Sequence, residues 1–347
     1  MSKNRDDFST EYDRYSDYED AFDPLRRDRQ ARRKRKPKQQ HQPKRNRQQV
    51  LQDIADVDAL EAGFAITYQP ALFEQGWLKE ALRPFFEQAL ITDVLAKVKG
   101  GKEANVYRCA AHPSTGVQWL AAKVYRPRMF RNLRNDKQYR QGRELLSTSG
   151  RPLKARDKRM QRAIAKGSSF GESLEHTSWL MHEYRAMQAL YNAGADVPRP
   201  YGVGEMAVIM GYVGDEQQPA PTLHEIHLPP DEARQIWRRI VHNIDCLLQQ
   251  GYAHGDLSAY NILYHEGAIT LIDFPQVVDI HHNPDARAIF ARDVYRVCQY
   301  LAEVGLFQNA ERIAHRVTAM LWERYVRGDF EDKLADVSLF EVEETDL

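Results

Sequence analysis

Alternating apolar and polar positions predict a small sheet in the first half of the chain. Residues 98–109 (VKGGKEANVYRC) and 119–127 (WLAAKVYRP) follow this pattern and predict a strand, a turn and two further strands. A short apolar run, ITLID at 269–273, predicts a buried strand that ends at Asp273. Lys123, in the middle of the second segment, is therefore expected to lie in a strand.

Three segments show the apolar spacing of helices. Residues 177–192 predict a helix that Thr177 or Ser178 caps, and residues 229–251 predict one that starts at a proline pair and stops at a glycine. Residues 77–98 predict a helix interrupted at its internal proline and packed on the sheet. The apolar face expected for the 229–251 helix consists of Ile236, Ile240, Val241, Ile244, Leu247 and Leu248.

The segment HGDLSAYNILYHEGAITLIDF, residues 254–274, carries the most specific chemical pattern. Asp256 and Asn261 lie five residues apart, so one short loop can present a carboxylate to an acceptor hydroxyl and an amide oxygen to a magnesium ion. Asp273 can bridge that metal to the β- and γ-phosphates of ATP. An Asp and an Asn near a turn can also be simple turn formers, but the whole spacing favours phosphoryl transfer. His254 is expected to fix the loop backbone.

A lysine of the upstream sheet is the expected partner of the nucleotide. The apolar neighbours of Lys123 favour a side chain that faces a cleft and contacts the α- and β-phosphates, rather than a solvated one. Such a lysine needs a carboxylate on the next helix to hold its ammonium group. We choose Glu183 for this ion pair. Glu172 and Glu175 are alternatives, and a solvated charge on the helix face is the competing interpretation.

Together these motifs resemble the RIO family of atypical serine protein kinases. The resemblance rests on GKEANVY, AAKVY, MGYVGDEQQPAPTL, HGDLSAYNILYH and LIDFPQVVD, and it extends from about Ala81 to about Leu301. It implies an α+β, two-lobed protein-kinase-like fold with a small β-rich N-lobe containing one main helix, a mostly helical C-lobe and no conventional activation loop. It also implies ATP and Mg2+ as cofactors, with Mn2+ as an alternative metal, and phosphorylation of protein serines in small ribosomal subunit maturation.

By matching position, the resemblance assigns roles to individual residues. Lys123 and Glu183 would form the ion pair, and Asp256 would be the catalytic base. Asn261 and Asp273 would bind the metal. The residues of the phosphate-binding turn would be Gly101, Lys102, Glu103 and Val106. The residues of the adenine-binding hinge would be Met210, Tyr212 and Val213.

The chain departs from the family pattern at two places. Lys99 and Gly100 stand where the family often has Ser-Thr before the glycine of the turn. Gly255 stands where ordinary protein kinases have an arginine that reads a phosphorylated activation loop, and no Ala-Pro-Glu follows Asp273. Activation-loop phosphorylation is therefore not expected to control this chain.

Charge is unevenly distributed, although the chain has 49 basic and 49 acidic residues. Residues 6–23 are acidic and residues 24–49 are densely basic, and neither segment has apolar periodicity, which predicts disorder. The basic segment suits rRNA or a small ribosomal subunit particle, because Lys and Arg at this density release counterions from phosphate backbones. A solvated tail that folds back on the acidic segment is the alternative.

The composition also bears on location and size. The three cysteines match no zinc spacing and fit a reducing cytoplasm. No apolar run approaches the length of a membrane span, and the N-terminus lacks the apolar core of a signal peptide, so a soluble cytoplasmic protein is expected. A length of 347 residues suits two compact lobes with tails. The sequence does not specify an oligomeric state.

The expected domain organisation has five parts. They are a tail over 1–49, a helical lead-in over 50–97 packed on the N-lobe, the N-lobe over 98–213, the C-lobe over 214–335 and an acidic tail over 336–347. A basic insertion at about 130–176 predicts a mobile loop and, by analogy, autophosphorylation. Its serines are Ser147, Ser149, Ser168, Ser169 and Ser173. Asp293 is expected to open or stabilise a helix of the C-lobe.

Two other functions share part of this pattern. A small-molecule kinase, for example for aminoglycosides or choline, would use the same His-Gly-Asp, Asn and Asp constellation, but KEANVY and the basic tail count against it. A ribosome-assembly factor that uses ATP binding or hydrolysis mainly as a docking switch is the alternative from the class of binding proteins.

Overall fold

Two hydrophobic cores organise the described part of the chain, one beneath a sheet and one among helices. The computed structural model describes residues 64, 66–70, 72–101, 103–126, 145–146, 150–153, 157–166 and 168–328. All of them belong to one of the two units into which the chain divides, residues 51–347. The predictions for both tails, the basic segment, Lys102, Ser147 and Ser149 lie outside the described residues.

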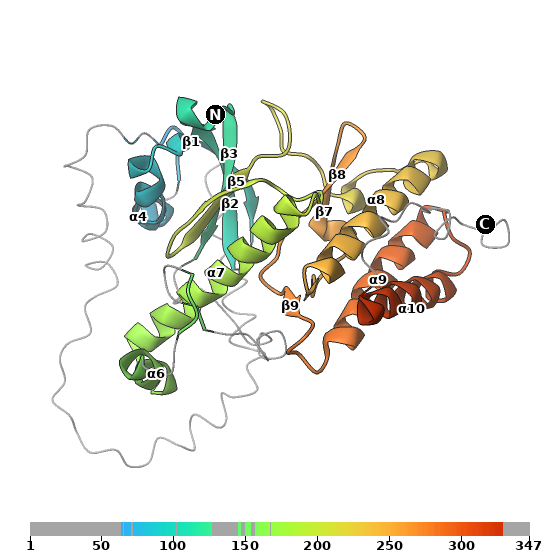
Figure 1. Cartoon of the computed structure of the whole chain (residues 1–347). Coiled ribbons are helices and arrows are strands. Elements are labelled where there is room, and N and C mark those ends of the chain that lie inside the picture. The colour runs from blue at the N-terminus through green and yellow to red at the C-terminus, as the bar shows by residue number, and fades with distance from the viewer. Residues whose placement is uncertain are drawn as a thin grey trace, which may run out of the picture. The chain divides into compact units, whose positions relative to one another are not determined.

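A five-stranded antiparallel sheet in the order β1-β2-β3-β5-β4 forms the first part (Figure 1). Its strands are β1 (Ile91–Gly100), β2 (Ala104–Ala111), β3 (Trp119–Tyr125), β4 (Pro200–Val203) and β5 (Ala207–Gly211). A short 3-10 helix, Pro113–Thr115, connects β2 to β3. The strands predicted within 98–109 and 119–127 are confirmed, and the first of them begins earlier than predicted.

Side chains of β3 alternate between the two faces of the sheet, as in any strand. Leu120, Ala122 and Val124 are buried in the core that also contains side chains of α4 (Leu72–Glu87). Lys123 and Tyr125 face the other way, toward α7 (Ser169–Asn192), where both contact Glu183. The two-residue period therefore brings Lys123 to the α7 side of the sheet.

The segment between residues 77 and 98 differs from its prediction. α4 continues through Pro84 to Glu87, and residues 91–100 form β1, so a helix interrupted at Pro84 and continued to 98 is wrong. Pro84 lies in the last turn of α4, and the helix continues for three residues beyond it. The chain leaves the helix at Ala89, which has a positive φ of 53°, a conformation usually taken by glycine. No glycine in the sequence marks this boundary.

The helix that carries Glu183 begins earlier than predicted. α7 is capped by Ser168, whose Oγ accepts a hydrogen bond from the Gly171 amide at 3.1 Å. Thr177 and Ser178 lie inside α7, so their assignment as caps is wrong. A Cβ on Gly171 would lie 2.1 Å from the carbonyl oxygen of Ala163 in α6 (Lys158–Ala165). Gly171 thus permits close packing of α6 on α7, and the insertion expected to be a mobile loop is partly helical.

The second core lies among α7, α8 (Pro230–Gln249), α9 (Ala286–Glu303) and α10 (Ala310–Arg327) (Figure 1). All six residues of the apolar face predicted for 229–251 are buried. Two small sheets pair β6 (Tyr252–Ala253) with β9 (Val278–Asp279) and β7 (Ile262–His265) with β8 (Ala268–Leu271). Short 3-10 helices lie at Leu223–Glu225 and Ala259–Asn261. The helices described here include none with the length and apolar character needed to cross a membrane.

The connection from Asp273 to α9 is short and largely buried. Phe274, Val277 and Val278 belong to the second core, and β9 within this connection pairs with β6. Residues 274–285 are described throughout and contain no long exposed loop. The fold therefore has a small sheet-based part and a larger helical part. Its segment between Asp273 and α9 is not a conventional activation loop.

Candidate active site

Lys123 lies between two carboxylates from distant parts of the chain. Its Nζ is 2.5 Å from Oε1 of Glu183 on α7 and 2.6 Å from Oδ1 of Asp273, which follows β8. The side chains of Lys123 and Glu183 are buried, whereas that of Asp273 is 40% exposed. The expected ion pair of Lys123 with Glu183 is thus present, and Asp273 joins it.

Electrostatics keep this group charged. Burial opposes the charged form of Lys123, but the carboxylates of Asp273 and Glu183 outweigh burial and raise the pKa of Lys123 well above its ordinary value. Burial likewise acts against ionised Asp273, yet the Lys123 ammonium group holds the pKa of Asp273 below its ordinary value. An ammonium group has three N–H donors, so Lys123 can hold both carboxylates and still donate to a phosphate oxygen.

Tyr125 is a member of this cluster that the sequence did not single out. Its hydroxyl is buried and donates a hydrogen bond to Oε2 of Glu183, and its ring packs edge-on against Trp179 at 4.8 Å. Glu183 is therefore held at both carboxylate oxygens, by Lys123 and by Tyr125. The two-residue spacing from Lys123 places Tyr125 on the same face of β3. This spacing could have indicated from the sequence that Tyr125 lies beside Lys123.

The loop between β6 and β7 brings Asp256 and Asn261 together. Nδ2 of Asn261 donates to the carbonyl oxygen of Asp256 at 2.8 Å and to its Oδ2 at 3.2 Å. The carbonyl oxygen of Asn261 accepts a hydrogen bond from the Ile272 amide at 2.9 Å. This bond ties the loop to the residue before Asp273, so the residues expected to act together occupy adjoining backbone.

Asn261 and Asp273 offer oxygen atoms of the kind that Mg2+ prefers. Because Nδ2 of Asn261 faces Asp256, its Oδ1 lies on the other side of the amide. Within the described ranges there is no group of three or more His, Cys, Asp or Glu side chains that could hold a metal by itself. Mg2+ commonly takes one or two protein ligands together with substrate phosphates, so these two residues fit it.

His254 and Gly255 shape the backbone of the loop. His254 is buried, its Nε2 is 3.1 Å from the carbonyl oxygen of Ile272, and its Nδ1 is 3.3 Å from the Asp256 amide. Burial lowers the pKa of His254, in keeping with the structural task expected of it. Gly255 has a φ of 84°, and a Cβ there would lie 2.1 Å from the carbonyl oxygen of Gln276. An arginine therefore has no room at this position.

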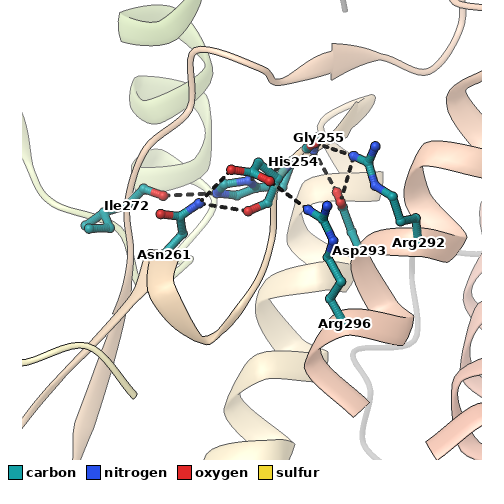
Figure 2. Close-up of polar contacts among 8 residues, drawn as sticks. His254, Gly255, Asn261, Ile272, Arg292, Asp293 and Arg296 are labelled. Atoms are coloured by element: carbon teal, nitrogen blue, oxygen red, sulfur yellow. Dashed lines mark hydrogen bonds and ion pairs between the residues drawn. The ribbon is translucent and has the colours of Figure 1, made fainter. Parts of the chain in front are cut away.

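Asp293 lies in the middle of α9 and does not open it, contrary to one part of the prediction. Its buried Oδ2 accepts a hydrogen bond from the Gly255 amide at 2.7 Å, and Arg292 lies 3.4 Å from its Oδ1 (Figure 2). Burial raises the pKa of Asp293 to about 7, although the Gly255 N–H and Arg292 favour the ionised form. Asp293 therefore anchors the loop to α9.

Arg296 is a second residue that the sequence did not single out. It lies on α9, and its Nη1 is 2.7 Å from Oδ1 of Asp256. In the sequence it resembles the other charged residues of this amphipathic helix. Its position one turn after Arg292 and Asp293 is the feature that places it beside the same loop (Figure 2).

The predicted phosphate-binding turn connects β1 to β2. A Cβ on Gly101 would lie 2.7 Å from the carbonyl oxygen of Ala104, so the turn is tight at this glycine. The carbonyl oxygen of Glu103 accepts a hydrogen bond from the Arg126 amide at 2.9 Å. Val106 pairs with Lys123 across β2 and β3, so the turn borders the Lys123 cluster. Contacts of these residues with phosphate stay a prediction.

The predicted hinge starts within β5, at Met210, and continues beyond the end of this strand. Met210 pairs with Ala121 of β3, and the carbonyl oxygen of Val213 accepts a hydrogen bond from the Ala220 amide at 3.0 Å. The ring of Tyr212 packs against Arg108 and Trp119. These three residues thus form the end of β5 and the segment after it, and their contact with adenine stays a prediction.

Comparison with known proteins identifies relatives. The model of the RIO domain family (RIO1) matches residues 105–313. Serine/threonine-protein kinase RIO1 of Chaetomium thermophilum is 27% identical over 241 residues, which cover 66% of this chain and 43% of that protein. RIO-type serine/threonine-protein kinase Rio1 of Haloferax volcanii is 26% identical over 228 residues, which cover 64% of this chain and 67% of that protein.

A solved structure, the Rio2 kinase-ADP/Mg2+-phosphoaspartate complex from Chaetomium thermophilum, matches with a TM-score of 0.45 and 19% identity over 82% of this chain and 86% of that one. The family model, in contrast, covers more than half of the chain and includes Lys123, Glu183, Asp256, Asn261 and Asp273. On that match, the chain belongs to the RIO domain family.

Proposed function

We propose that this chain is a RIO-type serine/threonine protein kinase that transfers the γ-phosphate of ATP to a serine hydroxyl, its own serines included. The observation that carries the proposal is the position of Lys123 between Glu183 and Asp273, beside a loop on which Asn261 binds Asp256. This is the set of groups that phosphoryl transfer needs. The relatives named as serine/threonine-protein kinases support the same reaction class.

In this proposal each polar group has one task. Lys123, held by Glu183, donates to the α- and β-phosphates. Asp256 accepts the proton of the attacking hydroxyl, and its carboxylate is kept in place by Asn261. Asn261 and Asp273 would hold Mg2+, or Mn2+ as an alternative metal, which would neutralise charge on the β- and γ-phosphates.

The remaining nucleotide contacts are assigned by position. The turn after β1 contacts phosphate through its backbone amides and Lys102, and the chain at Met210, Tyr212 and Val213 contacts the adenine base. The tightness of the turn at Gly101 supports the first assignment, because a side chain there would meet the backbone at Ala104. The pairing of β5 with β3 supports the second, since it fixes Met210 two residues along from Lys123 on the neighbouring strand.

We further propose a role in small ribosomal subunit maturation in the cytoplasm. The basic segment 24–49 supports binding of rRNA or a subunit particle, because clustered Lys and Arg release counterions from a phosphate backbone. Cys109, Cys246 and Cys298 are buried free thiols, which supports a reducing compartment.

The test is a single-turnover reaction of the full-length chain with ATP labelled at the γ-phosphate, with and without small ribosomal subunit particles. The label on protein serine and the label released as inorganic phosphate are measured separately. We expect labelled serine with the wild type and loss of that label with Asp256→Asn. Release of all the label as phosphate would favour the ATP-dependent docking switch, whereas normal labelling by Asp256→Asn would contradict the assigned base.

A further inference from the structure

α9 presents three charged side chains to the loop that carries Asp256. Arg292 donates to the carbonyl oxygen of Gly255, and Asp293 accepts from the amide of the same residue at 2.7 Å. Arg296, one turn further along α9, instead contacts the Asp256 carboxylate, with Nη1 2.7 Å from Oδ1. Figure 2 shows all three directed from α9 toward the loop.

The two arginines differ in what they hold. Arg292 and Asp293 bind backbone groups of Gly255, so they fix the path of the loop. Arg296 contacts a side chain with a proposed chemical role, and its own side chain is 39% exposed. The loop is already anchored without Arg296, since His254 and Asn261 also tie it to Ile272. The guanidinium group of Arg296 is therefore not needed to hold the loop backbone and is available for another contact.

Both oxygens of Asp256 have a partner in the structure. Oδ2 accepts from Nδ2 of buried Asn261 at 3.2 Å, and Oδ1 accepts from Arg296 at 2.7 Å. An acceptor hydroxyl that binds Asp256 must share or replace one of these contacts. Arg296 is the partner that can yield, because it is partly exposed and carries five N–H donors in a fork that suits a carboxylate or a phosphate.

Two other carboxylates of the described site are engaged by residues other than Arg296. Asp293 lies close enough to feel its charge but is committed to Gly255 and Arg292. Asp273 is committed to Lys123. A guanidinium group that gives up part of its contact with Asp256 is stabilised best by an anion that arrives with the substrate.

We propose that Arg296 is a specificity-determining residue of the acceptor site, which binds an anionic group, carboxylate or phosphate, beside the serine to be phosphorylated. The inference rests on the proposed kinase function and names the class of its protein substrate. When the acceptor hydroxyl takes its place at Oδ1 of Asp256, Arg296 passes to the anion of the substrate. Acceptors without such an anion leave Arg296 in competition for Asp256.

The experiment compares serine peptides that differ only in the residues beside the serine: aspartate, phosphoserine or asparagine. Transfer from ATP is measured with the full-length wild type, Arg296→Gln and Arg296→Lys. The control variant is Arg287→Gln, which removes an exposed arginine of the same helix. The basic segment 24–49 is present in every variant, so a difference between variants reports Arg296.

For the wild type we expect kcat/KM about tenfold higher with the anionic peptides than with the asparagine peptide, the size of one charge-assisted hydrogen bond. Arg296→Gln should remove this preference and leave the KM for ATP unchanged, Arg296→Lys should keep part of it, and Arg287→Gln should keep all of it. A wild type without the preference, or an equal loss with all three peptides in Arg296→Gln, would overturn the inference. The first of these results would leave the proposed kinase function standing.

Binding of the same peptides, labelled with a fluorophore and followed by anisotropy, separates the two proposals. Tighter binding of the anionic peptides by the wild type than by Arg296→Gln, without any transfer, would contradict the kinase function but support the anion site. Equal binding by both variants would contradict the anion site whatever the transfer assay shows. Preference for phosphoserine over aspartate, or the reverse, identifies the kind of anion.

Discussion

The two groups of polar side chains at the candidate site are built differently. The Lys123 cluster (Lys123, Tyr125, Glu183 and Asp273) joins β3, α7 and the segment after β8. Its first three members are buried and both oxygens of Glu183 are bound, whereas the side chain of Asp273 is 40% exposed. The Asp256 cluster (Asp256, Asn261 and Arg296) joins a loop to α9. The side chains of its charged members are partly exposed, that of Asp256 by 38% and that of Arg296 by 39%.

This difference separates side chains that are fixed before a substrate binds from side chains that can change hydrogen-bond partners when it binds. A buried group whose partners are all in place is fixed before a ligand arrives, and removal of one partner is costly. A half-exposed carboxylate can change partners at little cost, since water and incoming groups can replace what it loses. The Lys123 cluster is therefore suited to grip one substrate firmly, and the Asp256 cluster is suited to meet a second one.

The largest stability effect is expected from Lys123→Met. It leaves the buried Glu183 and the adjacent Asp273 without their cation, so the free energy of unfolding should fall by about 3–5 kcal/mol. Lys97→Met is the matched control, because Lys97 pairs with Glu74 at 3.1 Å but is 29% exposed, and its loss should cost about 1 kcal/mol or less. Urea denaturation measures both. Equal losses would remove the distinction between the buried Lys123–Glu183 pair and a more exposed ion pair.

Tyr125→Phe should have the next largest effect. It removes a buried hydrogen bond to the Glu183 carboxylate, so the free energy of unfolding should fall by about 1.5–3 kcal/mol. Glu183 would then hold the Lys123 ammonium group less firmly in position. We expect the KM for ATP to rise several-fold with a smaller change in kcat. Tyr107→Phe is the matched control, since the buried Tyr107 hydroxyl donates in the same way to Glu74. A similar rise of KM in both variants would mean that Tyr125 is merely structural.

Asp293→Asn tests how Asp293, which anchors the loop of the Asp256 cluster, makes the free energy of unfolding depend on pH. The pKa of Asp293 is about 7 in the folded chain against 3.8 ordinarily, so between these values the folded state binds the extra proton. The free energy of unfolding of the wild type should therefore fall as pH rises from 4 to 7 and level off above, by at most about 1.4 kcal/mol per pH unit. Asp293→Asn should lack this component. Parallel stability curves for the two proteins would contradict the raised pKa.

Much of the Lys123 cluster could be predicted from the sequence. A lysine among small apolar residues in a strand, a carboxylate on the next helix and an aspartate after an apolar run are each set by local periodicity, and the kinase-like spacing links them. Glu183, the carboxylate chosen from the sequence, lies on the face of α7 that meets β3 and contacts Lys123. The structure agrees with the first two positions, but the strand predicted over 269–273 is wrong at its end, because β8 stops at Leu271 and Asp273 lies beyond it with a positive φ of 73°.

Other features depend on contacts between segments that are distant in sequence. Gly171 looks like a helix breaker until its approach to Ala163 is seen, and Ala89 ends α4 without the glycine that would mark the boundary. Arg296 looks like a solvated charge, because a helix face gives no sign of the loop packed against it. Asp293 reads as a helix residue for the same reason, although its partner is Gly255. Tertiary packing, and not local pattern, determines these four.

The central claim is that the Lys123 cluster binds the nucleotide while Asp256 carries out transfer. It is tested most directly by parallel measurement of the Kd for ATP with Mg2+ and of the single-turnover transfer rate in Asp256→Asn and Glu183→Gln. We predict that Asp256→Asn slows transfer by about 10²–10⁴-fold with a Kd within about twofold of the wild type, whereas Glu183→Gln weakens ATP binding. A Kd raised equally in both variants, or undiminished transfer by Asp256→Asn, would contradict the account.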